Sequence, residues 1–273
     1  MADCCLCYND ETMSAAIRLI DTHAHLALSQ FADDRDAAIA RASAVGVARM
    51  VEIGYDLPTS RAAVALAEAH PHMFAVVGVQ ANHLADLPTT WLAEVQALAA
   101  HPKVVAIGEI GLDYHWMKAP PAEQEQVFRA QLGLARTLGL PVVIHSRDAQ
   151  SDTTRILNDA ARGQPGVMHS FSGNWAFAQA CLEVGFLLSL SGPLTFPKAA
   201  ELHEVARLAP LAMLLTETDS PYLTPHPHRG QRNEPAYVRL VATQIAALRG
   251  VPLAEVAAAV WANAERVFPR LRG

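Results

Sequence analysis

Two histidines separated by one residue, His23 and His25, are the first candidates for chemistry in this sequence. They follow the apolar segment Ile17–Asp21, which is typical of a short buried strand. Because side chains on a strand alternate between its faces, both imidazoles are expected on one side, where they would form half of a metal site. The same spacing occurs twice more without a preceding strand, at His70/His72 and His226/His228. Short pairs of this kind arise by chance, so their context must decide.

That context is a repeated alternation of strands and helices. Eight short apolar segments are predicted as strands: Ile17–Asp21, Arg49–Ile53, Phe74–Val79, Val104–Glu109, Val142–His145, Gly166–His169, Phe186–Leu190 and Met213–Thr216. Segments with helical spacing lie between them, at Asp33–Val45, Ser60–Ala69, Trp91–Ala100, Pro121–Leu138, Asp152–Ala161, Trp175–Val184 and Lys198–Leu208, and two more follow at Ala236–Leu248 and Leu253–Phe268. Eight such units in 273 residues predict a single α/β domain, a (β/α)₈ barrel of the TIM type.

Four more polar residues stand where predicted strands end. Glu109, His145 and His169 close the fourth, fifth and sixth strands, and Asp219 follows the eighth. The C-terminal strand ends form the catalytic face of such a barrel, and its closure places Asp219 beside the first strand. A carboxylate at the end of an apolar strand is costly unless it is paired or binds a metal. Together with the first histidine pair, these residues predict metal binding.

Composition limits the class of protein. The formal charge is −6 and the sequence pI is about 6.0, whereas proteins that coat duplex DNA are usually basic. An acidic enzyme can still bind a phosphodiester if metal ions supply positive charge locally. No apolar run approaches the roughly 20 residues needed to cross a bilayer, and no secretory signal is recognisable. We therefore expect a monomeric cytoplasmic enzyme without a membrane partner.

The cysteines do not suggest a disulfide framework. Three of the four, Cys4, Cys5 and Cys7, crowd into the first seven residues, whereas a framework would distribute them through the fold. We interpret residues 1–14 as a disordered leader and residues 15–273 as the barrel domain. Cys181 lies on an apolar helix face and is expected in the core.

The motifs resemble one family over most of the chain, from Ile17 to the C-terminus. The segments that carry the resemblance are Asp21–Leu26 (DTHAHL), Gly108–Tyr114 (GEIGLDY), Leu140–Arg147 (LPVVIHSR), His169–Gly173 (HSFSG) and Glu217–Leu223 (ETDSPYL), extended by Arg229–Gly230 and Arg232–Pro235. In this set the chain is similar to the TatD-type metal-dependent deoxyribonucleases of the amidohydrolase-like barrel superfamily. Five motifs in order make the match specific.

The resemblance implies a site with two divalent cations, Zn²⁺, Mn²⁺ or Mg²⁺. One cation would be held by His23, His25 and Asp219 and the second by His145 and His169, with Glu109 bridging them. A bridging carboxylate suits the roughly 3.5–4 Å spacing of two-metal sites. Asp219 and Glu109 would be the catalytic residues, with Asp219 as general base toward water. The implied activity is phosphodiester hydrolysis at single-stranded or frayed DNA ends, as in a 3′–5′ exonuclease.

Six residues are candidates for binding the substrate. Arg147 would clamp a phosphate, because a guanidinium binds phosphate through a bidentate fork, or it would form a surface salt bridge. Tyr114–Trp116 would stack on a nucleobase or pack over the barrel mouth. Arg229 and Arg232 stand on the catalytic face, where they contact substrate or where Glu234 fixes Arg232.

Two departures from the family pattern concern this same face. Gln80 replaces a histidine that the family usually carries after the third strand, and His83 is a candidate to compensate for it. Ser170 stands where the family often has cysteine. Neither change removes an expected metal ligand, but Gln80 puts substrate handling in question.

Two other functions fit parts of the pattern. The first is a hydrolase of the same superfamily with a small amide, lactone or phosphoester substrate, whose metals are often bridged by a carboxylated lysine instead of a glutamate. The second is a binding protein with little or no catalysis, suggested by Gln80 and opposed by the intact ligand set.

Overall fold

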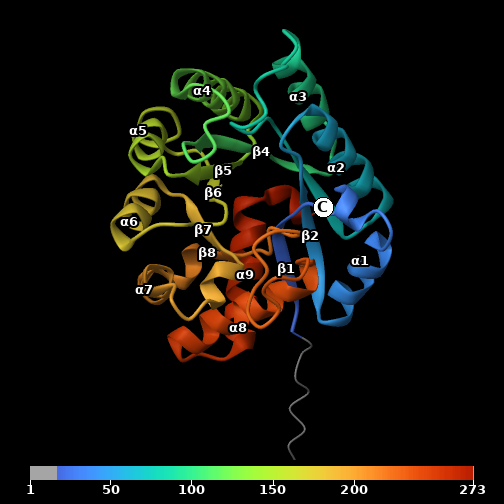
Figure 1. Cartoon of the computed structure of the whole chain (residues 1–273), viewed down its shortest axis with the longest axis vertical. Helices are drawn as coiled ribbons and strands as arrows, with labels where there is room; N and C mark the ends of the chain where they lie inside the picture. The colour runs from blue at the N-terminus through green and yellow to red at the C-terminus, as the bar shows by residue number, and fades with distance from the viewer. Residues whose placement is uncertain (1–16, 273) are drawn as a thin grey trace, which may run out of the picture.

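The computed structural model describes residues 17–272, in which eight parallel strands follow one another around a barrel (Figure 1). The strands are β1 (Leu19–Ala24), β2 (Val47–Ile53), β3 (Met73–Val77), β4 (Val104–Asp113), β5 (Val142–Arg147), β6 (Gly166–Met168), β7 (Leu187–Leu190) and β8 (Leu214–Thr216). Each strand pairs in parallel with the next one. The predicted (β/α)₈ architecture is therefore confirmed.

Most helices lie around the ring of strands, whereas the last one is drawn near the middle of the view (Figure 1). The helices are α1 (Arg35–Ala44), α2 (Leu57–Ala69), α3 (Trp91–Ala99), α4 (Pro121–Leu138), α5 (Gln150–Ala160), α6 (Trp175–Val184), α7 (Ala200–Leu208), α8 (Val238–Arg249) and α9 (Leu253–Val267). Short 3₁₀ turns occupy Ser29–Phe31, Gly192–Thr195, Leu211–Met213, Pro235–Tyr237 and Pro269–Arg272. The strand residues are buried because the helices cover one face and the barrel interior covers the other.

Side-chain caps fix where two of the helices begin. Asp56 precedes α2, and its carboxylate accepts a hydrogen bond from the backbone N–H of Thr59. The hydroxyl of Thr59 in turn accepts a hydrogen bond from the backbone N–H of Asp56. This capping box satisfies donors that the first helical turn leaves free. Asn174 caps α6 in the same way, and Gly185 ends it in the left-handed conformation at φ 99°. The loops after β2 and β6 therefore lead into helices whose first turns are fixed.

The barrel closes between β1 and β8, mainly at its C-terminal end. The backbone N–H of Asp219 donates to the carbonyl of His23 at 2.9 Å, and the N–H of His25 donates to Ser220 at 2.8 Å. The buried carboxylate of Asp21 accepts from the backbone N–H and the hydroxyl of Thr218, at 2.9 and 2.5 Å. The closure therefore relies on the segment that joins β8 to Asp219.

Three strands differ from the sequence-based bounds where they carry polar residues. β1 continues to Ala24 and therefore includes His23, β5 continues past His145, and β4 continues beyond Glu109 to Asp113. The extension of β4 needs a glycine at position 111, where φ is +139° and a Cβ would lie 2.0 Å from the carbonyl oxygen of His145. A polar residue in an apolar strand had suggested an earlier end.

Other expectations met different outcomes. Cys181 is buried in the core, as expected. The predicted leader and its three cysteines lie outside the described residues. No single helix within residues 17–272 combines the length and apolarity needed to cross a membrane, and the one consecutive pair that does, Pro235–Arg249 with Leu253–Val267, bends by 115°.

Candidate metal centre

A pocket of about 830 Å³ opens at the C-terminal ends of the strands. Its floor contains His25, Glu109, His145, His169 and Asp219, which come from five different strands or the loops directly after them. The barrel thus brings together residues that are far apart in the sequence, as predicted from its catalytic face. His23 lies beneath them and is fully buried.

One corner of the centre consists of His23, His25 and Asp219. Oδ1 of Asp219 lies 3.3 Å from Nε2 of His25 and 3.6 Å from Nε2 of His23. The backbone of Asp219 takes a left-handed conformation, at φ 57°, which is uncommon outside glycine and recurs at functional sites. These three residues offer ligand atoms that lie close enough together to hold one metal ion.

The ring nitrogens of this corner fit a cation. Nδ1 of His25 lies 3.0 Å from the carbonyl oxygen of Ile53, which can only accept a hydrogen bond, so Nδ1 carries the proton. In the neutral ring Nε2 then presents a lone pair, and it faces Nε2 of His23 at 3.2 Å and the carboxylate of Asp219. Several lone pairs thus point into one buried space, and a divalent cation bound there would satisfy all of them.

Glu109 lies between this corner and two further histidines. Its Oε1 is 3.0 Å from Nδ1 of His145 and 3.3 Å from Nε2 of His169, whereas its Oε2 is 3.5 Å from Nε2 of His23. The two carboxylate oxygens therefore face different sets of histidines. His23, Glu109 and His169 form a second group that could hold a metal ion.

The electrostatics of the centre favour positive charge. Burial opposes ionisation of Glu109, but the charge of His169 and hydrogen bonds from His145 and His169 hold the pKa of Glu109 well below its usual value. Burial also opposes a charge on His25, yet the hydrogen bond and charge of Asp219 raise the pKa of His25 to about 9. Divalent cations would supply the positive charge that the carboxylates of Glu109 and Asp219 attract.

Two acidic residues, to which the sequence pattern assigns no role, lie behind the centre. Oδ2 of Asp113 lies 3.0 Å from Nε2 of His145, and Oε1 of Glu217 lies 3.0 Å from Nδ1 of His169. Both acids are almost fully buried. The only signal for them in the sequence is an acid at the end of an apolar strand, which does not reveal the partner.

A third buried acid, Glu52, holds the loop that follows His25. Its two oxygens accept hydrogen bonds from the backbone N–H groups of Leu26 and Ala27, both at 2.8 Å. Burial raises the pKa of Glu52 to about 7, against the effect of these hydrogen bonds. The loop after the first histidine pair is therefore anchored to β2.

Among the predicted substrate-binding residues, Arg147 lines the pocket. Its guanidinium lies 5.6 Å from the ring centre of Trp116, within the range of a cation–π contact, and it forms no ion pair with the residues from 17 to 272. Trp116 also lines the pocket and is 57% exposed. Tyr114, in contrast, turns its hydroxyl to Asp152 at 2.9 Å and packs against the core.

The two arginines of the loop after β8 have protein partners. Arg232 donates to both carboxylate oxygens of Asp34, at 2.6 and 2.8 Å. Glu234, the candidate to fix Arg232, lies 3.8 Å from it in an ion pair and is bound more closely, in a fork, by Arg41. The guanidinium of Arg229 lies 4.4 Å from the ring centre of Phe196.

Gln80, which departs from the family pattern after β3, and His83, the candidate to compensate for it, both line the pocket. Gln80 is nearly buried, and its Oε1 accepts a hydrogen bond from the backbone N–H of Asn82 at 2.8 Å, which leaves its amide nitrogen for the pocket. The ring of His83 lies against Tyr55, tilted by 34° with ring centres 4.6 Å apart, and Tyr55 in turn packs edge-on against His25.

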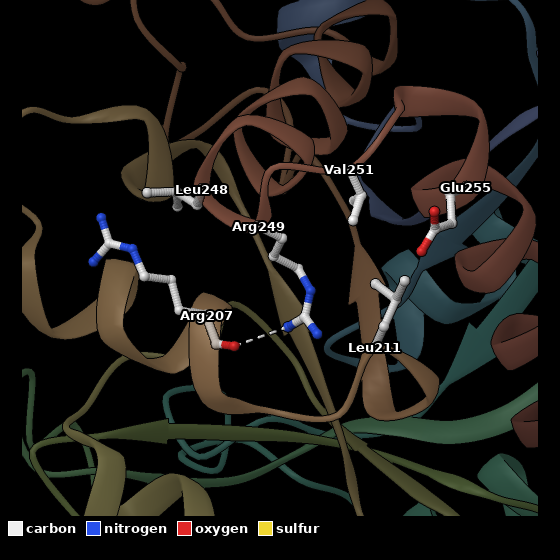
Figure 2. Close-up of a pocket in the computed structure, with 6 residues that line it drawn as sticks. All are labelled: Arg207, Leu211, Leu248, Arg249, Val251 and Glu255. Atoms are coloured by element: carbon white, nitrogen blue, oxygen red, sulfur yellow. Dashed lines mark hydrogen bonds between the residues drawn. The ribbon is translucent and has the colours of Figure 1, made fainter.

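A second pocket, of about 350 Å³, lies beside α7 and α8 and contains no histidine (Figure 2). Arg249 extends into it and donates hydrogen bonds to the backbone carbonyls of Ala206, Arg207 and Ala209. Its guanidinium therefore caps the C-terminal end of α7. The chemistry-bearing residues therefore gather in the first pocket.

Comparisons with known proteins agree with this geometry. The sequence matches the TatD related DNase family over residues 20–269. It is 45% identical to the "Uncharacterized metal-dependent hydrolase YabD" of Bacillus subtilis, covering 92% of this chain and 98% of that protein. It is 38% identical to the "3'-5' ssDNA/RNA exonuclease TatD" of Citrobacter rodentium, covering 92% and 97%. The crystal structure of YJJV, a TatD homologue from Escherichia coli, superposes with a TM-score of 0.85 at 32% identity, covering 93% and 99%.

Proposed function

This chain belongs to the TatD related DNase family of metal-dependent hydrolases, and on this basis we propose that it hydrolyses phosphodiester bonds at the ends of single-stranded nucleic acid with two divalent cations. The observation that carries the proposal is the position of Glu109. Its two oxygens face separate histidine sets, at 3.0 and 3.3 Å on one side and 3.5 Å on the other. This is the arrangement that a carboxylate shared by two cations requires.

The family resemblance supplies the proposed ligands, and the grouping of His23, His25 and Asp219 supports one set. These three residues would hold one cation and His145 and His169 the other, with Glu109 shared between the two sets. Mixed histidine and carboxylate ligands suit Zn²⁺ or Mn²⁺ better than Mg²⁺, which prefers oxygen. When bound, the cations supply the chemistry of two-metal sites, offsetting phosphoryl charge and lowering the pKa of water.

The protein residues divide the remaining work. Asp219 is the general base, because its carboxylate lines the pocket and its backbone is held by the carbonyl of His23. Arg147 binds a phosphate of the substrate strand, and Trp116 stacks on a base beside it. Both residues stand at the mouth of the pocket, outside the floor that holds the ligands.

Relatives support the substrate class. Several proteins at 37–38% identity carry the name "3'-5' ssDNA/RNA exonuclease", and a pocket of about 830 Å³ has room for the end of one strand. We propose DNA ends, attacked in the 3′–5′ direction, as the substrate. A cytoplasmic, monomeric enzyme remains our prediction from the sequence.

The proposal is tested with 3′- and 5′-end-labelled single-stranded DNA, in matched reactions with Mn²⁺, Zn²⁺ or a chelator. We expect stepwise shortening from the 3′ end that requires the cation and is lost in His145→Ala. Bound metal without any shortening of DNA or RNA would contradict the proposal and favour a small-molecule hydrolase. Protein that binds no metal would favour the binding-protein alternative.

A further inference from the structure

The two histidines that share Oε1 of Glu109 approach it through different ring nitrogens. His145 faces Glu109 with Nδ1, at 3.0 Å, and turns Nε2 to Asp113, also at 3.0 Å. His169 does the opposite, with Nε2 at 3.3 Å from Glu109 and Nδ1 at 3.0 Å from Glu217. Each ring therefore lies between Glu109 and its own buried acid.

A neutral imidazole carries one proton, and its position decides which nitrogen can bind a cation. Both nitrogens of each ring face a carboxylate, which only accepts hydrogen bonds. A cation bound beside Glu109 would take the place of the proton on that side, so the nitrogen beside Asp113 or Glu217 would keep the proton and the other nitrogen would present its lone pair. Asp113 would thus leave Nδ1 of His145 free, and Glu217 would leave Nε2 of His169 free.

Hydrogen bonds to neighbouring groups hold the carboxylate of Asp113 in this orientation. Its Oδ2 also accepts from Nδ2 of Asn82 at 2.9 Å, and its Oδ1 accepts from the backbone N–H groups of His115 and Trp116 at 3.1 and 2.9 Å. Buried Gln124 holds the backbone of Asp113 at both its N–H and its carbonyl. Together with Nε2 of His145, four donors therefore point at the carboxylate of Asp113, a residue that is only 1% exposed.

We propose that Asp113 is a positioning residue that fixes His145 in the Nε2–H tautomer, so that Nδ1 serves as the metal-binding atom. The inference rests on the proposed function in one respect only, that a cation binds beside Glu109. The same carboxylate holds the backbone of Trp116, so it also joins the metal centre to the rim of the pocket.

Glu217 provides a matched control, because its hydrogen bonds are distributed differently. Its Oε1 accepts both from Nδ1 of His169 and from the backbone N–H of Ser170, whereas its Oε2 is buried without a partner among the described residues. In Glu217→Gln the amide oxygen can take the place of Oε1 and keep both bonds. In Asp113→Asn, either orientation of the amide places its NH₂ group against two donors.

The two isosteric variants should therefore behave differently. In Asp113→Asn we expect His145 to move its proton to Nδ1, so that Nε2 can accept from the new amide and Nδ1 can no longer bind metal. Loss of a hydrogen-bond partner behind a metal ligand typically weakens metal affinity about 10–100-fold. Glu217→Gln should retain affinity within a few-fold of the parent protein, since an amide oxygen still holds the proton of His169.

The experiment combines two readouts that need no enzymatic activity. Nitrogen-15 NMR of the Zn²⁺-loaded, histidine-labelled parent protein should show opposite tautomers for His145 and His169, and equilibrium dialysis with Zn²⁺ should rank the two variants as above. Circular dichroism and thermal melting check that each variant folds. If Asp113→Asn does not fold, the tautomers of the parent protein still decide the proposal.

Two results would overturn the inference: an Nδ1–H tautomer of His145 in the Zn²⁺-loaded parent protein, or parent-like Zn²⁺ affinity in a folded Asp113→Asn variant. Neither result depends on nuclease activity. A parent protein that binds Zn²⁺ with the expected tautomers but does not cut nucleic acid would leave the role of Asp113 intact and contradict the proposed function instead.

Discussion

Asp219 contacts His23 twice, through a backbone hydrogen bond and through its side chain. Its N–H donates to the carbonyl of His23 at 2.9 Å, and its Oδ1 faces Nε2 of the same residue at 3.6 Å. The backbone hydrogen bond does not depend on the charge of the carboxylate. The position of Asp219 and its chemical role can therefore be separated by a substitution that keeps its shape.

Asp219→Asn should retain metal and lose turnover. The amide oxygen can still face His25, while an amide cannot accept a proton from water at neutral pH. General-base contributions are typically about 10²–10⁴-fold, so we expect kcat to fall by that factor with nearly unchanged metal content. Turnover on single-stranded DNA and metal content by mass spectrometry are measured on the same sample. Near-normal kcat would refute the role as base.

Divalent cations should stabilise the folded chain, because the proposed ligands come from β1, β4, β5, β6 and β8. A ligand at about 100 times its Kd adds about 2.7 kcal/mol when it binds only the folded state. For a domain of this size that corresponds to a rise in Tm of roughly 5–10 °C. Differential scanning calorimetry with Zn²⁺ and with a chelator measures the rise, and His23→Ala should reduce it. Identical melting in both conditions would speak against a cation site.

Trp116→Ala should weaken substrate binding while leaving the chemistry intact. Base stacking on an aromatic ring is worth about 1–3 kcal/mol, so KM for single-stranded DNA should rise roughly 5- to 150-fold at similar kcat. Tyr114→Phe is the matched control, because the hydroxyl of Tyr114 is directed to Asp152 and the residue does not line the pocket. Steady-state kinetics on an oligonucleotide distinguish them, and equal KM values in both variants would exclude stacking on Trp116.

The ion pairs between α4 and α5 should make part of the stability depend on pH. Hydrogen bonds from Arg155 and Arg129 lower the pKa of Glu125 from 4.5 to about 2. Because the pKa is lower in the folded chain, the stabilisation is present above pH 4.5 and is lost as the pH falls toward 2. Surface pairs contribute less than about 1 kcal/mol, so Glu125→Gln should lower Tm by up to roughly 4 °C at pH 7.

The difference in Tm between Glu125→Gln and the parent chain should disappear near pH 2. Melting curves of both proteins at several pH values test this, with Glu204→Gln, an acid outside these ion pairs, as a control. A constant difference across the range would mean that the effect of Glu125 does not come from its charge.

The sequence contains enough information for the barrel and for the six residues that meet on its catalytic face. Apolar β-branched segments and helical spacing are local signals, and barrel closure follows from counting them. The roles of Asp113 and Glu217 could not be predicted in this way, because they depend on which ring nitrogen of a distant histidine faces them. The partner of Arg232 likewise belongs to the loop before α1, where Asp34 lies, and no local pattern reveals that contact.

The closure between β1 and β8 also determines when, during synthesis of the chain, the candidate metal centre can form. β1 and its histidines are made among the first segments of the chain, whereas Asp219 and Ser220, which bond to them, are made long after. A nascent chain thus carries His23 and His25 without the acid that completes their corner. The centre can assemble only after the ribosome has delivered β8, so prematurely terminated products lack it.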